Sequence, residues 1–347
     1  MKKSNMFMGY QIIFFLFFLG CQLNALEPWT AAYRHIIDPI QAQKNAHRSM
    51  LVFSKDMALP YTQLIFSWNI PRPQKGFFSF FVMARDAQTK QWSTWYKMAD
   101  WGAGWQNSYG SKLKNSAGYH HVRLELPAQR KADAFRIKIT VHQRASLASV
   151  RGLYVSVSDF TKFGSEILDK SHMRLASVRV PVETRYSQMN IDHEHADRMC
   201  SPTASSMLLS HLCRQRVDPR AFALYVYDKE LDTYGNWAFN TAQAYEWCAG
   251  RVLFYVERLH SFTLLHALLA KKIPVVVSIR GPIPGGFSEY SNGHLLLVVG
   301  WDKQHKRVIC HDPAAPSDAQ VLVQYPIKSF LEAWERSRRL AYVAQPL

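Results

Sequence analysis

Apolar and polar residues alternate over several short runs in the first half of the chain. From Phe135 to Val141 every second residue is apolar, and polar Arg136, Lys138 and Thr140 lie between them. This period of two is typical of a β-strand with one buried and one wet face. Similar runs, separated by turn residues, occupy 63–69, 76–85, 92–98, 122–126 and 150–157. Their regular spacing predicts an N-terminal antiparallel β-sandwich of jelly-roll type, which we place at residues 26–165.

The pattern changes in the second half, after a polar and charged connector at 161–178. Apolar residues recur at helical spacing behind Cys200, where Ser201 is a good N-cap and Pro202 fits the first helical position. Further helices are expected at 240–248, 261–270 and 327–335, and strands at 251–257, 274–279, 294–301 and 307–312. Because helices come first and strands later, we predict an α+β domain at residues 180–347.

The N-terminus predicts export. Lys2 and Lys3 precede the apolar run 12–19, which is shorter than a membrane-spanning helix requires. A small-residue cleavage site after Ala25 makes residues 1–25 a signal peptide. Cys21 ends a lipobox-like segment, so a lipid anchor there is an alternative, and an uncleaved membrane anchor is another. We expect a periplasmic or extracellular protein.

Composition and charge narrow the class of partner. The chain has 347 residues, enough for two domains, and 48% hydrophobic with 20% charged residues describes a globular protein. Its formal net charge of +16 suits an anionic surface or polymer. The basic residues are scattered and no nucleic-acid motif accompanies them. We therefore expect an anionic cell-envelope polymer as a partner, and no nucleic acid.

Five tryptophans gather in the predicted sandwich. Exposed tryptophans there would stack on sugar rings, whereas buried ones would fill the core, and we favour the core. Trp92 and Trp95 are three residues apart, so they cannot both point inward from one strand. The five are Trp68, Trp92, Trp95, Trp101 and Trp105.

Export also decides how the five cysteines are interpreted, since disulfides persist in oxidising compartments. Cys21 is lipidated or removed, and a catalytic Cys200 would stay free. The remaining cysteines are Cys213, Cys248 and Cys310, an odd set. Cys213 with Cys248 is the first pair to test, because both lie on helices beside the expected site. The sequence alone leaves the connectivity open.

Cys200 is the candidate nucleophile. A sulfur at a helix N-terminus meets free N–H groups and the positive end of the macrodipole, and both favour the reactive thiolate. The alternative is a buried structural cysteine before an ordinary helix.

His294 and Asp312 are the candidate partners of Cys200 in a catalytic Cys–His–Asp arrangement. His294 begins one apolar strand and Asp312 ends the next, with a turn at 302–304. A hairpin centred on Lys303 would make His294 and Asp312 directly opposed neighbours on one face. A carboxylate beside a histidine orients the imidazole and stabilises its protonated form. His311, His305 and Asp302 rank lower, and no spacing typical of a zinc site occurs, so we expect neither a metal nor a cofactor.

Several motifs carry a family resemblance. They are Ser187-Gln188-Met189, Cys200-Ser201-Pro202-Thr203, Gly235-Asn236-Trp237, Gly293-His294 and His311-Asp312-Pro313, in that order. This part of the chain, about 180–345, resembles the secreted, transporter-free branch of cysteine peptidases similar to the bacteriocin-leader (double-glycine) peptidases. The region before it, with Ser67-Trp68-Asn69, also resembles the region that precedes this domain in that branch.

The resemblance implies a papain-like fold and a set of roles. Cys200 would be the nucleophile, His294 the general base and acid, and Asp312 the orienting group. Gln188 would bind the oxyanion together with the N–H of the nucleophile. Ser201 departs from the glycine that many leader peptidases carry after the nucleophile.

We therefore expect an exported thiol hydrolase that cleaves an amide or thioester bond in a peptide or peptide-like envelope substrate. Acyl or peptide transfer by the same three residues is one alternative. A non-catalytic envelope-binding module that has kept the fold is another.

Overall fold

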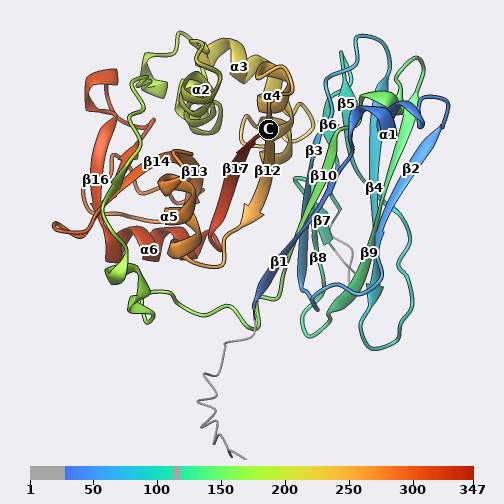
Figure 1. Ribbon diagram of the computed structural model, residues 1–347, viewed down its shortest axis with the longest axis horizontal. Coiled ribbons are helices and arrows are strands. Elements are labelled where there is room, and N and C mark those ends of the chain that lie inside the picture. The colour runs from blue at the N-terminus through green and yellow to red at the C-terminus, as the bar shows by residue number, and fades with distance from the viewer. Residues whose placement is uncertain (1–27, 112–117) are drawn as a thin grey trace, which may run out of the picture.

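The protein, seen here in a computed structural model that describes residues 28–111 and 118–347, is built from two halves that lie side by side (Figure 1). The N-terminal half is almost entirely β-structure, and the C-terminal half mixes helices with one antiparallel sheet. The predicted signal peptide and Cys21 lie outside the described residues. Within the described ranges, no helix has both the length and the apolar character needed to cross a membrane.

The N-terminal half contains two five-stranded antiparallel sheets, ordered β1-β10-β3-β8-β7 and β2-β9-β4-β5-β6. Their strands are β1 (Thr30–Ile36), β2 (Met50–Lys55), β3 (Gln63–Asn69), β4 (Phe77–Asp86), β5 (Tyr96–Gly102), β6 (Asn107–Ser108), β7 (Gly118–His120), β8 (Arg123–Glu125), β9 (Ala132–His142) and β10 (Gly152–Ser158), with a short helix α1 (Pro39–Gln43) after β1. The alternation predicted for β9 is present, since Phe135, Ile137 and Ile139 are buried. The jelly-roll description and the domain bounds stay predictions.

Aromatic side chains join the two sheets. The Trp68 ring on β3 stacks on Phe80 of β4 with centroids 4.0 Å apart, and Trp101 is fully buried beside them. Trp105 is 47% exposed. The predicted strand at 92–98 is wrong at its start, because β5 begins at Tyr96 and Trp92 makes only an isolated bridge with Arg85.

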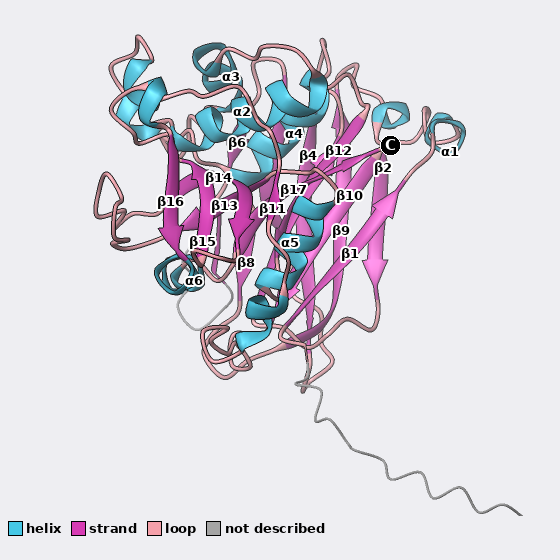
Figure 2. Cartoon of the chain, turned by 60° about the vertical axis from the view of Figure 1, so that its left-hand side comes forward, coloured by secondary structure: helices cyan, strands magenta, loops and turns pink. Residues whose placement is uncertain are grey.

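The C-terminal half is organised on a seven-stranded sheet of order β12-β17-β13-β14-β15-β16, with β11 paired to β14. The strands are β11 (Val178–Arg179), β12 (Val252–Arg258), β13 (Val275–Ile279), β14 (His294–Asp302), β15 (Arg307–His311), β16 (Leu322–Pro326) and β17 (Leu340–Pro346). The helices are α2 (Cys200–Cys213), α3 (Pro219–Val226), α4 (Trp237–Trp247), α5 (Phe262–Ala270) and α6 (Ile327–Arg336). Helices α2, α3 and α4 gather at one end of this half, whereas α6 lies near the other end (Figures 1 and 2).

The two halves share a packed contact. Strands β3 and β10 are buried on both faces. The Asn69 side chain donates to the carbonyl of Phe254 on β12 (2.7 Å) and accepts from its N–H (3.1 Å). The Ser67 hydroxyl accepts from the N–H of Val256. The outer face of one N-terminal sheet is therefore covered by β12, which positions β8 beside the C-terminal half.

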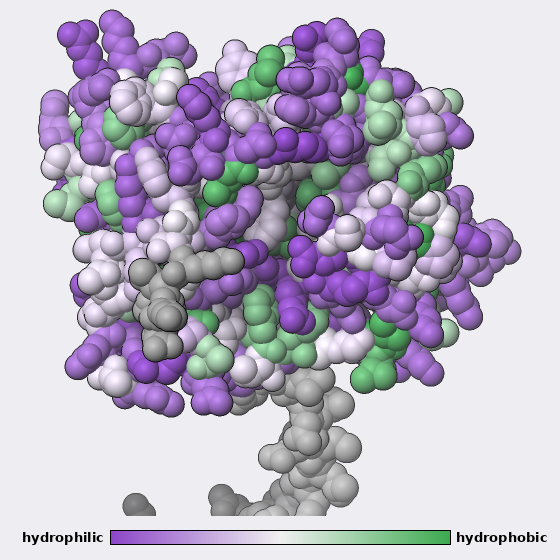
Figure 3. Space-filling view, turned by 180° about the vertical axis from the view of Figure 1, so that it is seen from behind, coloured by the Kyte–Doolittle hydropathy of each residue, from purple (hydrophilic) through white to green (hydrophobic). Residues whose placement is uncertain are grey.

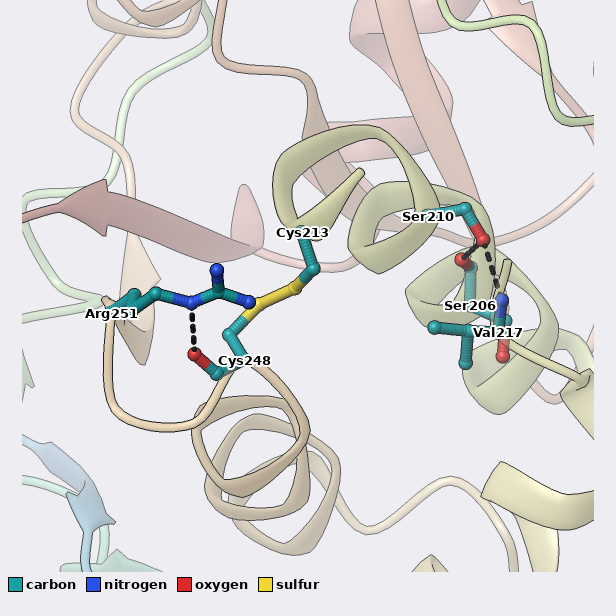
Figure 4. The surroundings of a disulfide bond; sticks show 6 residues. All are labelled: Ser206, Ser210, Cys213, Val217, Cys248 and Arg251. Carbon is teal, nitrogen blue, oxygen red and sulfur yellow. Dashed lines mark hydrogen bonds between the residues drawn. A yellow bond between two sulfur atoms is a disulfide. The ribbon is translucent and has the colours of Figure 1, made fainter. Parts of the chain in front are cut away.

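A disulfide bond joins Cys213, the last residue of α2, to Cys248 directly after α4 (Figure 4). This is the pair that the sequence placed first. Nearby, the carbonyl of Cys248 accepts a hydrogen bond from Nε of Arg251, and the Ser210 hydroxyl accepts from the N–H of Val217. The bond ties the far end of the Cys200 helix to its neighbour.

Removing this disulfide is expected to lower stability without changing the fold. The bridge closes a loop of sequence separation 35, for which the chain-entropy model gives about 3 to 4 kcal/mol. We expect Cys213→Ala combined with Cys248→Ala to lower the free energy of unfolding by about this amount, measured by urea denaturation. Reductant should destabilise the wild type and leave the double variant unchanged. An unfolding midpoint of the wild type that ignores reductant would contradict the bridge.

Candidate active site

Cys200 is the first residue of α2, so the helix begins two residues earlier than predicted. Met199 is the N-cap, and the predicted N-cap, Ser201, is instead buried with its hydroxyl 2.9 Å from that of Tyr342 on β17. No side chain of the N-cap residue caps α2. The Thr203 N–H makes the first helical hydrogen bond to the Met199 carbonyl, and the Thr203 hydroxyl donates to the same oxygen. Pro202 is tolerated because N–H groups in the first turn have no intrahelical acceptor.

The Cys200 thiol is partly exposed and its pKa is depressed. Burial raises this pKa, but a hydrogen bond and charge interaction with His294 outweigh it, helped by the backbone N–H groups of Leu295 and Ser201. The charged thiolate is therefore favoured over the thiol. The described chain has one other free cysteine, Cys310, whose thiol is buried and has a raised pKa.

His294 connects the thiol to a carboxylate. Its ring is only 4% exposed, and Nε2 lies 2.7 Å from Oδ1 of Asp312, which leaves Nδ1 for the sulfur of Cys200. Burial lowers the pKa of His294, but the Asp312 charge and hydrogen bond, with those of Cys200, raise it to about 10. The geometry favours a thiolate–imidazolium pair with the imidazolium oriented by a carboxylate.

The hairpin register is different from the one predicted. The ladder pairs Leu297 with His311 and Val298 with Cys310, and a bulge follows before Gly300 pairs with Ile309. The connecting turn is longer than expected and lies over 303–306. If the pairing of Leu297 with His311 is extended by one residue, Asp312 lies opposite Leu296. Asp312 is therefore a diagonal neighbour of His294. The slip is two residues, which keeps both side chains on one face of the sheet.

Two tyrosines complete the carboxylate's surroundings, and the sequence analysis did not identify them. Oδ2 of Asp312 accepts hydrogen bonds from the hydroxyls of Tyr290 (2.9 Å) and Tyr325 (2.6 Å), and Oδ1 also accepts from the N–H of Ala314. The Tyr290 ring stacks on His294 with centroids 4.3 Å apart. Burial raises the pKa of Asp312, but His294 and these hydrogen bonds lower it below its ordinary value. The sequence offered one signal for Tyr290, since it is an aromatic residue in a polar loop four residues before His294. No sequence pattern pointed to Tyr325.

Gln188 lies on the wall of the same cleft as Cys200. Its N–H donates to the carbonyl of Pro313, directly after Asp312, and Nε2 donates to the carbonyl of Asp197 (2.6 Å). The amide NH₂ carries a second hydrogen. The structure thus brings Gln188 to the site predicted for it, and its oxyanion role stays a prediction.

The lower-ranked residues take no part in this arrangement. His305 and Asp302 bond to one another in the exposed turn. His311 is buried, and burial together with Arg185 and Arg179 lowers its pKa to about 4. Over 28–111 and 118–347, no group of three or more His, Cys, Asp or Glu side chains could hold a metal ion.

A cleft of about 1390 Å³ opens over Cys200. Its walls come from both halves, because Arg123 and Glu125 of β8 face the cleft together with Cys200, His294 and Gln188. Seen from behind, the molecule has a hollow near its middle, with mostly hydrophilic side chains around it (Figure 3). The arrangement provides a nucleophile, a proton carrier and room for an extended chain.

Comparisons with known proteins show what the C-terminal half is similar to. Residues 182–342 match the model of the Peptidase_C39 like family. Among solved structures, xylellain, a cysteine protease from Xylella fastidiosa, is similar at 13% identity and a TM-score of 0.32, with 53% of this chain and 91% of that chain covered. No curated protein matches.

Proposed function

We propose that this chain, whose residues 182–342 match the model of the Peptidase_C39 like family, is an exported thiol hydrolase. It cleaves an amide or thioester bond through an acyl-enzyme on Cys200. The observation that carries the proposal is the continuous link from Cys200 through His294 to Asp312. Intact residues at all three positions favour an enzyme over a non-catalytic binding module.

The first half-reaction forms the acyl-enzyme. The Cys200 thiolate attacks the substrate carbonyl carbon, and the oxygen becomes an oxyanion near the Cys200 N–H and the Gln188 amide. The imidazolium of His294 then gives its Nδ1 proton to the leaving amine or thiol as the bond breaks.

The second half-reaction releases the acyl group. Neutral His294 takes a proton from water, the resulting hydroxide attacks the thioester carbon, and the acid leaves while the thiolate is regenerated. Asp312 keeps the imidazole oriented and stabilises its positive form throughout. An amine that replaces water in this step would give transfer instead of hydrolysis, so product analysis distinguishes the two.

Export is supported by two independent features. The first 25 residues have the pattern of a signal peptide. The Cys213–Cys248 disulfide suits an oxidising compartment such as the periplasm or the cell exterior. A mature N-terminus near Leu26, or a lipidated Cys21, is the result expected from cell fractionation and N-terminal sequencing.

The proposal is tested by the pH dependence of iodoacetamide alkylation. Because the pKa of Cys200 is depressed and that of His294 is raised to about 10, the thiolate–imidazolium pair exists between these two values. We expect alkylation of the wild type to reach half its maximal rate below pH 8.5, the ordinary pKa of a free cysteine. His294→Ala should move this midpoint upward, since burial then acts on the thiol without a compensating cation.

Cys310→Ala is the matched control, because it removes the other free thiol of the described chain and should leave the profile unchanged. A wild-type midpoint near pH 8.5 that His294→Ala does not move would show that no Cys–His pair exists.

A further inference from the structure

Positive charge dominates the cleft over Cys200. The only carboxylates on its described walls are Glu125 and Asp197. Against them stand six arginines, Arg123, Arg198, Arg258, Arg280, Arg336 and Arg338. Two of the six have ion-pair partners, since Arg123 lies 3.0 Å from Glu125 and Arg198 lies 3.0 Å from Asp232. Among the residues that the structure describes, the other four have no carboxylate within ion-pair distance.

Arg258 is buried without a counter-charge. It is 3% exposed, and its guanidinium donates only to neutral oxygens, namely Oε1 of Gln63 and the carbonyls of Ser337 and Arg338. Burial, together with the like charges of Arg123 and Arg338, lowers the pKa of Arg258 to about 9. A buried cation held in this way is costly unless an anion approaches it.

Arg280 and Arg336 are held together beside His294. Arg280 directly follows Ile279, the cross-strand partner of His294, and its side chain is exposed. The guanidinium of Arg336 donates to the carbonyls of Arg280 (2.6 Å) and Pro282 (3.0 Å). Gly281 makes room for it, because a Cβ at this position would lie 2.7 Å from Nε of Arg336. The Arg336 guanidinium is thus held against the backbone of Arg280, and both residues line the cleft.

Arg338 adds a third exposed cation on the same wall. Its guanidinium carbon lies 5.2 Å from the centroid of Phe160, which also lines the cleft, and 5.2 Å from that of Phe163. Contacts with the two ring faces leave the in-plane N–H groups of the guanidinium available to an acceptor.

We propose that the cleft binds an acidic peptide segment of the substrate, with carboxylates of that segment paired to Arg280, Arg336 and Arg338. Planar guanidinium groups match carboxylates in bidentate geometry, and several unpaired cations in one groove concentrate an anionic chain there. The inference rests on the proposed function, because it takes Cys200 as the point of cleavage. It adds the substrate class, a peptide rich in aspartate or glutamate around the bond that is cut.

The test is protection of Cys200 from iodoacetamide by two synthetic peptides, one of alternating glutamate and glycine and one of alternating glutamine and glycine. A peptide that fills the cleft blocks the Cys200 thiol whether its glutamates lie on the N-terminal or the C-terminal side of the residue above the sulfur. We expect the glutamate peptide to protect at a concentration at least about tenfold lower than the glutamine peptide, with the difference shrinking at high salt.

Arg280→Gln combined with Arg338→Gln should raise the protecting concentration of the glutamate peptide by about tenfold or more. Neither guanidinium donates a described hydrogen bond, so this variant keeps the fold. Arg144→Gln combined with Arg174→Gln is the matched control, because both residues are exposed and neither lines the cleft. It removes the same charge and should leave protection unchanged.

Equal protection by the two peptides, or equal loss in both double variants, would overturn the acidic-substrate assignment. The alkylation rate without peptide reports separately on the Cys–His pair. A depressed midpoint that His294→Ala moves upward, combined with equal protection, would therefore remove this inference and leave the proposed function standing. A midpoint near pH 8.5 that His294→Ala does not move would remove the proposed function itself.

Discussion

Replacing Cys200 by alanine is expected to abolish acyl-enzyme formation and hydrolysis while the protein stays folded. The thiolate is the only group in the site that can form the covalent bond, so the loss of turnover should be on the order of a millionfold, as for other triad nucleophiles. His294→Ala should cost a comparable amount, because a triad acts as a unit and its losses are not additive. Hydrolysis of a model thioester, followed by mass spectrometry of the trapped acyl-enzyme, measures both.

The free energy of unfolding is the control measurement for these variants. Cys200 is partly exposed, and its replacement removes one sulfur atom, so the free energy of unfolding should change by less than about 1 kcal/mol. Cys310→Ala should retain full activity. Turnover of Cys200→Ala above a hundredth of the wild-type rate would place the nucleophile elsewhere.

The second large effect is expected at Asp312. Asp312→Ala leaves the ring nitrogen of His294, two tyrosine hydroxyls and the N–H of Ala314 without their acceptor. Each unsatisfied buried group costs about 1 to 3 kcal/mol, so the variant should be strongly destabilised as well as inactive. For this reason Asp312→Ala alone cannot separate orientation from folding.

Asp312→Asn makes that separation. The amide oxygen still accepts from His294 and Ala314, and its NH₂ donates to the tyrosine oxygens, so the imidazole stays in place. The negative charge that raises the pKa of His294 is lost. The pKa of His294 should therefore fall, and the midpoint of Cys200 alkylation should move to higher pH, with a smaller loss of turnover than in Asp312→Ala.

Tyr325→Phe is the matched test of the tyrosines. It removes one hydrogen bond to Oδ2 and keeps the ring, so we expect a rise in the pKa of Asp312 and a loss of turnover of roughly tenfold or less. Unchanged alkylation profiles in both Asp312→Asn and Tyr325→Phe would show that the carboxylate does not act through His294.

Local patterns in the sequence were sufficient for several parts of the site. A helix near Cys200 was predictable because apolar residues recur at helical spacing behind it and Pro202 is tolerated in the first turn. His294 and Asp312 fall on one face although the predicted register was off by two, because side chains on a strand alternate with a period of two. The same reasoning predicted the alternation of β9. Such features depend on residues close together in the chain.

Other parts were decided only when distant segments came together. Ser201 lost its predicted N-cap role because Tyr342, on a strand absent from the predicted set, takes its hydroxyl. Tyr325 reaches Asp312 only through the pairing of β15 with β16, which no local pattern encodes. The positive charge of the cleft was also decided by tertiary packing, because arginines scattered from Arg123 to Arg338 line one cavity only after the two halves pack. The sequence by itself determined which groups are reactive, because reactivity begins with residue type and local backbone. The tertiary structure decided what surrounds them, because contacts between distant segments depend on packing over the whole chain.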